Sequence, residues 1–293
     1  MEIAQRVIDE TRAAVKQAGQ LLLTFYGKKL EIHDKDQAGF ATNADMASEK
    51  FLIAALEKIL PRASWLAEEE GFSPGAPEKQ FSHSVNDSSP AFFGDKEEGF
   101  SPGGKSGNNE LCWVIDPLDG TTNFARQIPY FCVSVALTSQ GHPILGIVYD
   151  PLRDELFVAQ QGKPTTLNGK PVAVSRVQTL DKAMVFFGLP YTKGKAHSDT
   201  LKTADALAPK IFAYRHLGAI ALEQAYVACG RADGLFFQEL GWWDIAAGML
   251  LIQEAGGTVT TYHGTVPTAD YRSYLAGNTE IYRQLMLYLA QED

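Results

Sequence analysis

Apolar residues recur with a helical period in the first part of the chain. Residues 2–26 form one amphipathic segment, and residues 46–60 form a second, which Pro61 ends. The apolar runs at 64–67 and 111–115 have the length and composition of buried strands. This part of the chain is therefore predicted to contain two helices followed by two strands.

Strand patterns dominate the middle of the chain. Apolar runs at 130–138 and 143–149 flank the tetrapeptide 139–142, Ser-Gln-Gly-His, which is a hairpin signal. A strand at 154–160 and an Asn-Gly turn within 167–170 extend the same pattern. These features predict a mainly antiparallel sheet.

Strands and helices alternate from about residue 183 onward. The predicted elements are strands at 184–187, 211–214 and 234–237 and helices at 197–208, 218–229 and 243–255. This alternation is typical of an α/β unit. We therefore expect two sheets with helical layers between and outside them, divided into an N-terminal α+β subdomain (1–182) and a C-terminal α/β subdomain (183–293).

The composition is that of a soluble globular protein. The 293-residue chain is 45% apolar and 21% charged, and no run reaches the ~18 apolar residues that a membrane span needs. Its amphipathic N-terminus does not resemble a secretory signal, so we expect a cytoplasmic protein without a membrane partner. A net charge of −9 disfavours non-specific nucleic-acid binding. The three cysteines are predicted to be reduced core thiols.

Two carboxylates stand three residues apart in the stretch 113–124, Trp-Val-Ile-Asp-Pro-Leu-Asp-Gly-Thr-Thr-Asn-Phe. Pro117 is expected to end the preceding strand, which would place Asp116 and Asp119 at its exit. Gly120 permits a tight turn, and a helix starting just after it would direct free backbone N–H groups at an anion. The stretch therefore predicts a divalent-metal and phosphate site. The alternative is an ordinary Asp-Gly turn.

The segment 242–257 predicts a helix that begins at Asp244 and ends at a double glycine. Asp244 is well placed as the N-cap residue of this helix. Capping alone, worth about 1 kcal/mol, would account for the presence of an aspartate. A structural cap and a functional carboxylate are therefore equal alternatives when the residues are considered alone.

Together with Ala-Glu-Glu at 67–69, these two segments resemble the three metal-binding signatures of the inositol monophosphatase family of magnesium-dependent, lithium-sensitive phosphatases. The resemblance extends from about residue 5 to 285. It implies the layered αβαβα sandwich of inositol monophosphatases and fructose-1,6-bisphosphatases, which agrees with the two sheets predicted above. Dimers are common in the family, so the resemblance also implies a homodimer.

The resemblance implies roles for individual residues around two or three magnesium ions. The implied metal ligands are Glu68, Asp116, the backbone carbonyl of Leu118, Asp119 and Asp244. The implied phosphate and substrate contacts are Gly120, Thr121, Asp119, Gly218, Ala219 and Glu239. Water activated beside Glu68 would attack the phosphate directly. Thr121 and Asp45 would orient this water. Glu69 would be an acidic residue behind the metal ligands that does not bind the metal itself. Magnesium suits this set because it prefers carboxylate and carbonyl oxygens.

A direct repeat offers two candidates for the first acidic ligand. The sequence Glu-Glu-Gly-Phe-Ser-Pro-Gly occupies 69–75 and recurs 28 residues later at 97–103. We favour Glu68 over the second cluster because a helix end and a strand precede it. Residues 71–109 are predicted to be an inserted flexible loop, rich in Ser, Pro, Gly and Asn. This loop either borders the mouth of the site or is a tolerated surface insertion.

The resemblance is weaker at the substrate wall. Phe237 stands where relatives that act on inositol phosphate carry a glutamate for sugar hydroxyls, and a phenyl ring cannot accept hydrogen bonds. Glu239 is the predicted substitute. The resemblance implies a phosphomonoesterase for a small polyol or sugar phosphate, foremost inositol 1-phosphate. The alternatives are a fructose-1,6-bisphosphatase, a nucleotide 3′-phosphatase and a non-catalytic partner of transcription antitermination.

Overall fold

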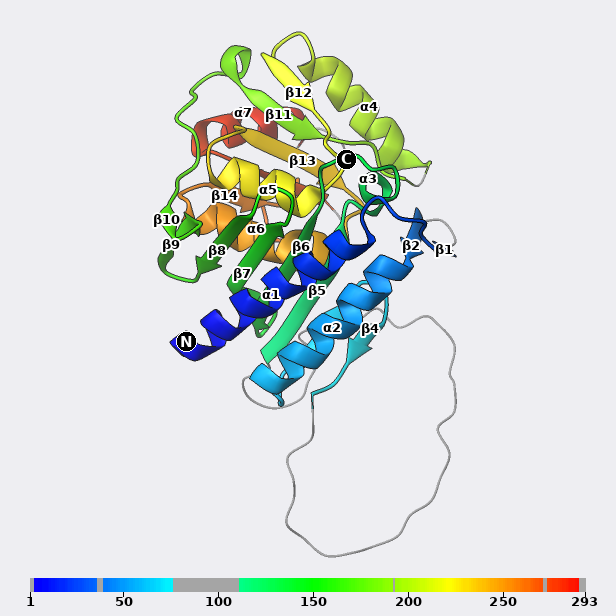
Figure 1. Ribbon diagram of the computed structural model, residues 1–293. Helices are drawn as coiled ribbons and strands as arrows, with labels where there is room; N and C mark the ends of the chain where they lie inside the picture. The colour runs from blue at the N-terminus through cyan, green and yellow to red at the C-terminus, as the bar shows by residue number, and fades with distance from the viewer. Residues whose placement is uncertain (1–2, 36–38, 76–110, 192, 271–272, 290–293) are drawn as a thin grey trace, which may run out of the picture.

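Two β-sheets and three layers of helices alternate through the molecule (Figure 1). The structure is a computed structural model that describes residues 3–35, 39–75, 111–191, 193–270 and 273–289. Within these ranges the helices are α1 (Gln5–Phe25), α2 (Asn43–Ile59), α3 (Thr121–Ala125), α4 (Lys195–Leu207), α5 (Ile220–Ala228), α6 (Trp242–Glu254), α7 (Thr279–Leu289) and the short 3-10 helix η1 (Leu180–Lys182).

The larger sheet has the strand order β10-β9-β8-β7-β6-β5-β3-β4. Its strands are β3 (Ser64–Ala67), β4 (Gly71–Ser73), β5 (Leu111–Asp119), β6 (Cys132–Ser139), β7 (His142–Asp150), β8 (Glu155–Gln160), β9 (Lys163–Leu167) and β10 (Lys170–Pro171). Only β3 and β5 run parallel, so the predicted antiparallel character is confirmed. Gln140 and Gly141 have φ of 52° and 77°, as the two-residue turn between β6 and β7 requires.

The smaller sheet has the strand order β12-β11-β13-β15-β14. Its strands are β11 (Met184–Phe187), β12 (Ala213–Arg215), β13 (Gly234–Gln238), β14 (Thr258–Thr260) and β15 (Ser273–Gly277), while β1 (Ile32–Lys35) and β2 (Gly39–Thr42) form a separate hairpin. The three strands that the sequence predicted are parallel to one another. The antiparallel strands β14 and β15 were not predicted, because such short segments do not display a strand period of their own.

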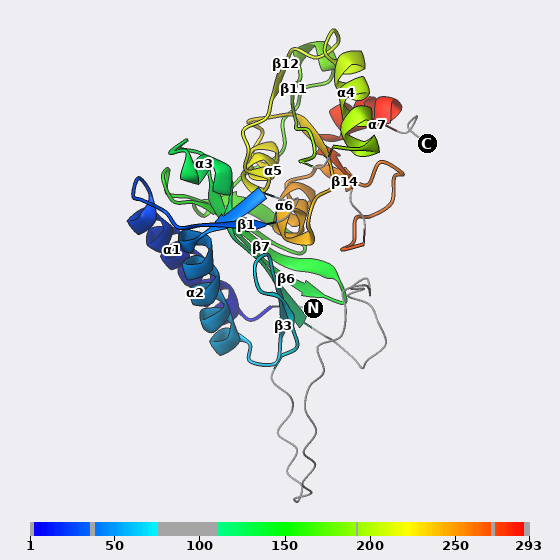
Figure 2. The same cartoon turned by 90° about the vertical axis from the view of Figure 1, so that its right-hand side faces the viewer.

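The helices cover both faces of the larger sheet and separate it from the smaller one (Figure 2). Helices α1 and α2 pack on one face of the larger sheet, α5 and α6 lie between the sheets, and α4 and α7 pack on the outer face of the smaller sheet. Three hydrophobic clusters fill these interfaces. The predicted αβαβα layering is therefore confirmed. The proposed subdomains 1–182 and 183–293 share a core, because α5 and α6 from the second pack on the sheet of the first.

Two predictions about local structure are wrong. Pro117 does not end its strand, because a register irregularity between Asp116 and Asp119 lets β5 continue without a ladder hydrogen bond from the proline. Residues 71–73, expected in the flexible insertion, form strand β4 against β3. Residues 76–109 of that insertion lie outside the described residues, together with the second copy of the repeat.

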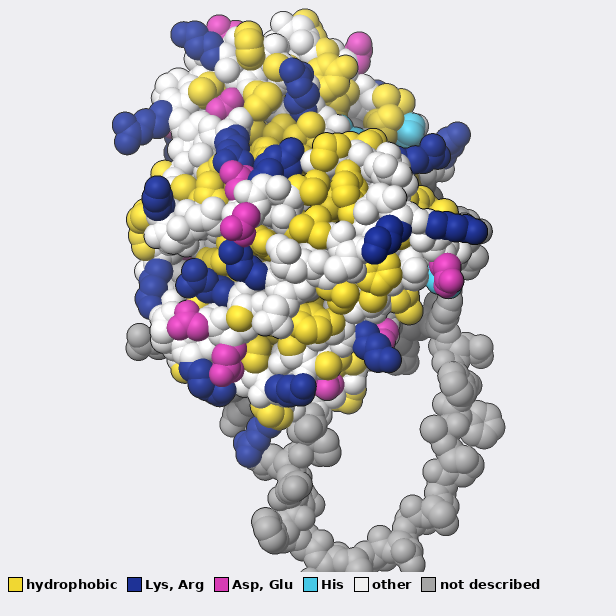
Figure 3. Space-filling model, in the orientation of Figure 1, with side chains coloured by type: hydrophobic (Ala, Val, Ile, Leu, Met, Phe, Trp, Pro, Cys, Tyr) yellow, Lys and Arg dark blue, Asp and Glu magenta, His cyan; other side chains and the backbone are white. Residues whose placement is uncertain are grey.

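The structure also bears on what composition predicted about membrane helices, surface charge and the cysteines. None of the helices that the structure describes is long and apolar enough to cross a membrane. On the face seen in Figure 3, lysine and arginine side chains are scattered among acidic, polar and apolar ones. Cys112, Cys132 and Cys229 are all free thiols, and Cys132 is fully buried. The expected position in the core is therefore found for Cys132, whereas Cys112 and Cys229 are only partly buried.

Candidate active site

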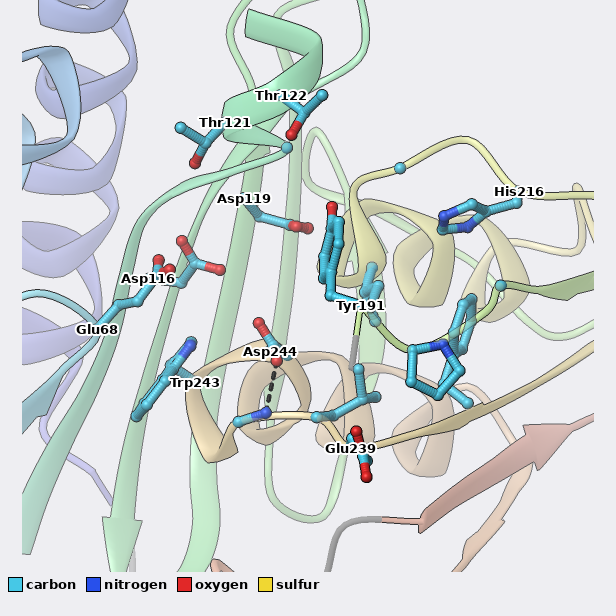
Figure 4. Close-up of a pocket in the computed structure, with 18 of the residues that line it drawn as sticks. Glu68, Asp116, Asp119, Thr121, Thr122, Tyr191, His216, Glu239, Trp243 and Asp244 are labelled. Atoms are coloured by element: carbon cyan, nitrogen blue, oxygen red, sulfur yellow. Dashed lines mark hydrogen bonds between the residues drawn. The ribbon is translucent and has the colours of Figure 1, made fainter. Parts of the chain in front are cut away.

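A pocket of about 310 Å³ opens where the end of β5 meets the first turns of α5 and α6 (Figure 4). Five carboxylates line it. Four of them are the predicted metal ligands, from three separate parts of the chain: Glu68 after β3, Asp116 and Asp119 on β5, and Asp244 on α6. The fifth is Glu239. In Figure 4 the Glu68 and Asp116 side chains lie next to each other, and Asp119 and Asp244 are directed at the same space. The fold thus gathers all four predicted acidic side chains in one cavity.

A glycine shapes the end of β5. Gly120 has a φ of 92°, and an added Cβ would lie 3.1 Å from both the Ala219 Cβ and the Tyr130 carbonyl oxygen. A side chain at this position would therefore be strained and crowded. Gly120 is also the N-cap of α3, and the first N–H groups of a helix have no acceptor within it. The turn brings Thr121 and its neighbour Thr122 to the pocket wall.

Helix α2 supports the site through three polar side chains on one face. Asp45, Ser48 and Glu49 are spaced i, i+3 and i+4, and each is at most 1% exposed. Thr121 Oγ1 lies 2.9 Å from Asp45 Oδ1 and 3.0 Å from the Leu118 carbonyl oxygen. Ser48 donates a hydrogen bond of 2.9 Å to the carbonyl of Pro117. Through these contacts α2 is fixed to the irregular end of β5.

Asp45 also begins the helix on which it lies. Its Oδ2 accepts the Thr42 N–H at 2.9 Å, and the Thr42 hydroxyl in turn caps the first turn of α2. Burial raises the pKa of Asp45, while its hydrogen bonds with Thr42 and Thr121 act in the opposite direction. Asp45 therefore lies behind Thr121 and does not itself line the pocket.

Glu49 holds the turn that carries Glu68. Its two carboxylate oxygens accept the backbone N–H groups of Glu69 and Glu70 at 2.9 Å and 2.8 Å. Burial raises the pKa of Glu49 to about 7, although these two donors favour the charged form. The sequence analysis missed Ser48 and Glu49. Their spacing from Asp45 on the face that also carries Leu52 and Leu56 was the available signal.

Asp119 connects β5 to the start of α5. Its Oδ2 accepts the Ala221 N–H at 2.6 Å and lies 3.5 Å from the Cys132 sulfur. Burial raises the pKa of Asp119 to about 7, and the N–H donors of α5 partly offset this effect. Burial also raises the pKa of the Cys132 thiol well above its usual range. Cys132 is therefore a protonated neighbour of Asp119 and not a reactive thiolate.

Asp244 is not the N-cap residue that the sequence predicted. Helix α6 begins at Trp242, its N-cap is Gly241, and Asp244 is the third helical residue. Its carboxylate reaches back to accept the Gly241 N–H at 2.6 Å, which is the acidic half of a capping box. The prediction placed the N-cap three residues too late. An aspartate stabilises the start of a helix either as the N-cap or as the third helical residue, so its presence does not decide between the two positions. Asp244 combines a capping contact with a place in the pocket wall.

The carboxylates of the pocket repel one another. Burial raises the pKa of Asp116 well above its usual range, and the charges of Glu68, Asp119 and Asp244 raise it further. The described lining contains no lysine or arginine that would offset this charge. Carboxylate and carbonyl oxygens suit a hard divalent cation, so the donor set fits magnesium chemically. Among the described residues, no three acidic, His or Cys side chains stand in the arrangement of a preformed metal-binding group.

The structure brings most of the predicted site residues together. Those that line the pocket are Glu68, Asp116, Leu118, Asp119, Gly120, Thr121, Gly218, Glu239 and Asp244. Ala219 is fully buried behind Gly120, and Glu69 contributes its backbone N–H to Glu49 without lining the pocket. Phe237 is in the wall, whereas the Glu239 carboxylate points away from the other carboxylates in Figure 4. The individual roles of these residues remain predictions.

Known proteins share this sequence and fold. The model of the inositol monophosphatase family matches residues 4–292. The chain is 35% identical to Nus factor SuhB of Xylella fastidiosa over 92% of the chain and 88% of that protein. It is 34% identical to inositol-1-monophosphatase of Synechocystis over 94% of the chain and 86% of that protein. The crystal structure of the extragenic suppressor protein suhB from Bartonella henselae superposes with a TM-score of 0.82, at 32% identity, covering 97% of this chain and 98% of that one.

Proposed function

This chain belongs to the inositol monophosphatase family, and from that premise we propose that it is a magnesium-dependent phosphomonoesterase for a small polyol or sugar phosphate, foremost inositol 1-phosphate. The observation that carries the proposal is the convergence of Glu68, Asp116, Asp119 and Asp244 on one pocket. Burial raises the pKa values of Asp116 and Asp119, and the charges of Glu68, Asp119 and Asp244 raise that of Asp116 further. Such a site favours cations, and a phosphate group binds readily beside them.

The metal would be held by carboxylates and one carbonyl. We assign one magnesium ion to Glu68, Asp116 and the Leu118 carbonyl, and a second to Asp116, Asp119 and Asp244. When bound, magnesium supplies positive charge to the phosphoryl oxygens and lowers the pKa of water. Glu49 keeps Glu68 in reach by holding the backbone of the following turn.

The chain itself would bind and orient the reacting groups. The backbone N–H groups of Gly120 and Thr121, at the start of α3, would donate hydrogen bonds to the phosphate. The single hydroxyl proton of Thr121 is directed at Asp45 or the Leu118 carbonyl. Its oxygen is thereby left to accept a hydrogen bond from water, which would orient that water for direct attack on phosphorus. No phosphorylated side chain is needed.

Phosphate release from a substrate panel tests the proposal. The panel contains inositol 1-phosphate, fructose 1,6-bisphosphate, adenosine 3′,5′-bisphosphate and histidinol phosphate, each with and without magnesium and lithium. We expect magnesium-dependent, lithium-sensitive release with preference for inositol 1-phosphate. Preference for another member would keep the chemistry and identify a sugar bisphosphatase or nucleotide 3′-phosphatase.

A pair of matched variants shows whether the pocket carries the activity. Asp119→Asn removes one charge from the pocket and is expected to abolish most of the release. Asp181→Asn makes the same change at an exposed residue of η1 outside the pocket and should have no effect. Release that survives both Asp119→Asn and removal of magnesium would overturn the proposal.

A second function is favoured by the names of relatives. Several proteins that are 32–35% identical to this chain are called Nus factor SuhB. On that basis the chain is a candidate partner of the transcription machinery. Readthrough by a purified transcription complex would be measured with the native chain and with Asp119→Asn. Full activity of that variant in transcription, without phosphate release, would assign the biological role to binding.

Homodimerisation and a cytoplasmic location remain predictions. Light scattering on the purified chain would measure its mass in solution. A mass near 32.0 kDa would contradict the predicted dimer.

A further inference from the structure

A buried carboxylate organises the loop between β12 and α5. Glu223, on α5, is fully buried, and its Oε1 accepts the backbone N–H groups of Leu217 and Gly218 at 2.5 Å and 3.0 Å. Gly218 lines the pocket, so Glu223 fixes a piece of the pocket wall from behind. The other carboxylate oxygen, Oε2, is buried and has no hydrogen-bond partner. A buried carboxylate with an unpaired oxygen needs a further compensating group.

His216 lies beside this carboxylate, on the side of Oε1 and not of the unpaired Oε2. Its Nδ1 lies 3.6 Å from Glu223 Oε1, which is within ion-pair range but longer than a hydrogen bond. In the part of the chain that the structure describes, no lysine or arginine forms an ion pair with Glu223. The negative charge favours the tautomer that keeps its proton on Nδ1, because the N–H dipole then points at the carboxylate. The other ring nitrogen, Nε2, is left as an acceptor on the opposite edge of the ring.

The ring of His216 is confined by its neighbours. A Cβ added to Gly188 would lie 2.6 Å from ring atoms of His216, so only glycine lets the imidazole pack on this backbone. The Phe237 ring centroid lies 5.9 Å away at a tilt of 52°. The side chain is 46% exposed, it lines the pocket, and in Figure 4 the ring extends from its loop into the cavity. The exposed edge of the ring therefore faces the space that a substrate would occupy.

We infer that His216, oriented by Glu223, accepts a hydrogen bond from a hydroxyl group of the substrate through Nε2. The inference rests on the proposed phosphatase function and names how the same pocket recognises a polyol or sugar ring. Phe237 cannot accept a hydrogen bond, and the Glu239 carboxylate points away from the cluster, whereas the imidazole lies against Phe237 and presents an acceptor there. Glu223 is a positioning residue, because it does not line the pocket itself and acts through His216 and the Gly218 backbone.

A neutral acceptor suits this pocket better than another carboxylate. The pocket is already lined by five carboxylates, and a further negative charge would repel both them and the phosphate of the substrate. An imidazole accepts a hydroxyl hydrogen bond without adding negative charge. A site built to hold a hydroxyl discriminates against an analogue that lacks it, since the polar group of the site is then left unpaired.

The test compares two substrates of the same ring size in the magnesium-bound enzyme. Inositol 1-phosphate carries ring hydroxyls, and cyclohexyl phosphate lacks them. We expect His216→Phe to lower the ratio of their kcat/KM values by about three- to tenfold, as the loss of one hydrogen bond predicts. The loss should appear in KM for inositol 1-phosphate, with little change for cyclohexyl phosphate. Hydrolysis of cyclohexyl phosphate also reports whether the variant is folded.

Three further variants assign the effect. His216→Gln retains an acceptor and should recover part of the ratio, and Glu223→Gln should reproduce the KM effect by releasing the ring. His142→Phe removes an exposed imidazole that does not line the pocket and should leave the ratio unchanged. An unchanged ratio in His216→Phe would overturn the inference, as would an equal loss in His142→Phe. If the native enzyme hydrolyses neither substrate, the proposed function itself fails.

Discussion

Replacing Glu49 by glutamine tests how the fold holds the turn of Glu68. Glu49 is 1% exposed and accepts two backbone N–H groups, from Glu69 and Glu70. An amide of the same size has one acceptor oxygen, so one of these N–H groups loses its partner. The substitution also removes a buried negative charge. The lost hydrogen bond lowers the stability of the folded chain, whereas removal of the buried charge raises it. Only the effect of the charge depends on pH, so measurements at several pH values separate the two.

The magnitude follows from the pKa of Glu49. Raising a carboxyl pKa from 4.5 to about 7 disfavours the charged form by about 3 kcal/mol, and solvent at the adjoining turn reduces this to about 1–2 kcal/mol. Because the pKa is higher in the folded chain, the folded state binds more protons between pH 4.5 and 7. The native chain therefore loses stability relative to Glu49→Gln as the pH rises through this window. At low pH both side chains are neutral and the difference is small.

Urea unfolding of both chains from about pH 4.5 to 8 measures this difference in stability. The other titrating groups are the same in the two chains, so their contributions cancel in the difference. Glu57→Gln is the matched control, because Glu57 lies on the same helix, is exposed and accepts the Trp65 indole N–H at 3.2 Å. We expect its stability difference from the native chain to be independent of pH. A difference for Glu49→Gln that is also independent of pH, or that favours the native chain as the pH rises, would refute the reasoning.

Three other outcomes follow from the structure. Gly120→Ala should lower the free energy of unfolding by about 1–3 kcal/mol, since alanine at a φ of 92° is strained; denaturation that matches the native chain would contradict this. Gly248→Ala should cost about 1–3 kcal/mol in the same measurement because its Cβ would overlap Gln224, although alanine favours helices by about 1 kcal/mol; a stabilised variant would be the contrary result. Magnesium binding should release more protons at about pH 6.5 than at 8.5, because the pKa of Asp119 is about 7 without metal, and calorimetry in buffers of different ionisation enthalpy would count them.

Local patterns located the elements that carry the site. Helices α1, α2, α5 and α6 and strands β3, β6 and β7 were predicted within a few residues, because periodicity depends on neighbours along the chain. Asp116 and Asp119 were identified from the motif at the end of their strand, whereas Asp244 was distinguished from an ordinary helix cap only by the resemblance of its segment to the family signature. Each lies in a continuous segment whose turn and cap residues can be recognised from the sequence of that segment alone.

Other features of the site depend on contacts between distant segments. Glu49 binds the turn after β3 only because α2 packs against that end of the larger sheet. His216 faces the pocket, with Glu223 behind it, only because α5 is inserted between the two sheets. Neither the hydrogen bonds of a buried carboxylate nor its neighbours can be inferred from its own segment.

The sequence by itself determined the order of helices and strands, the layered fold class and the identity of the acidic cluster, since these follow from local periodicity and motif. Only the tertiary structure decided that β5 runs through Pro117, that Asp244 is the third residue of α6 and that the carboxylate pKa values are raised. Strand register depends on the partner strand, and desolvation depends on the layers stacked above a residue. Both are set when remote segments meet, and no local pattern encodes them.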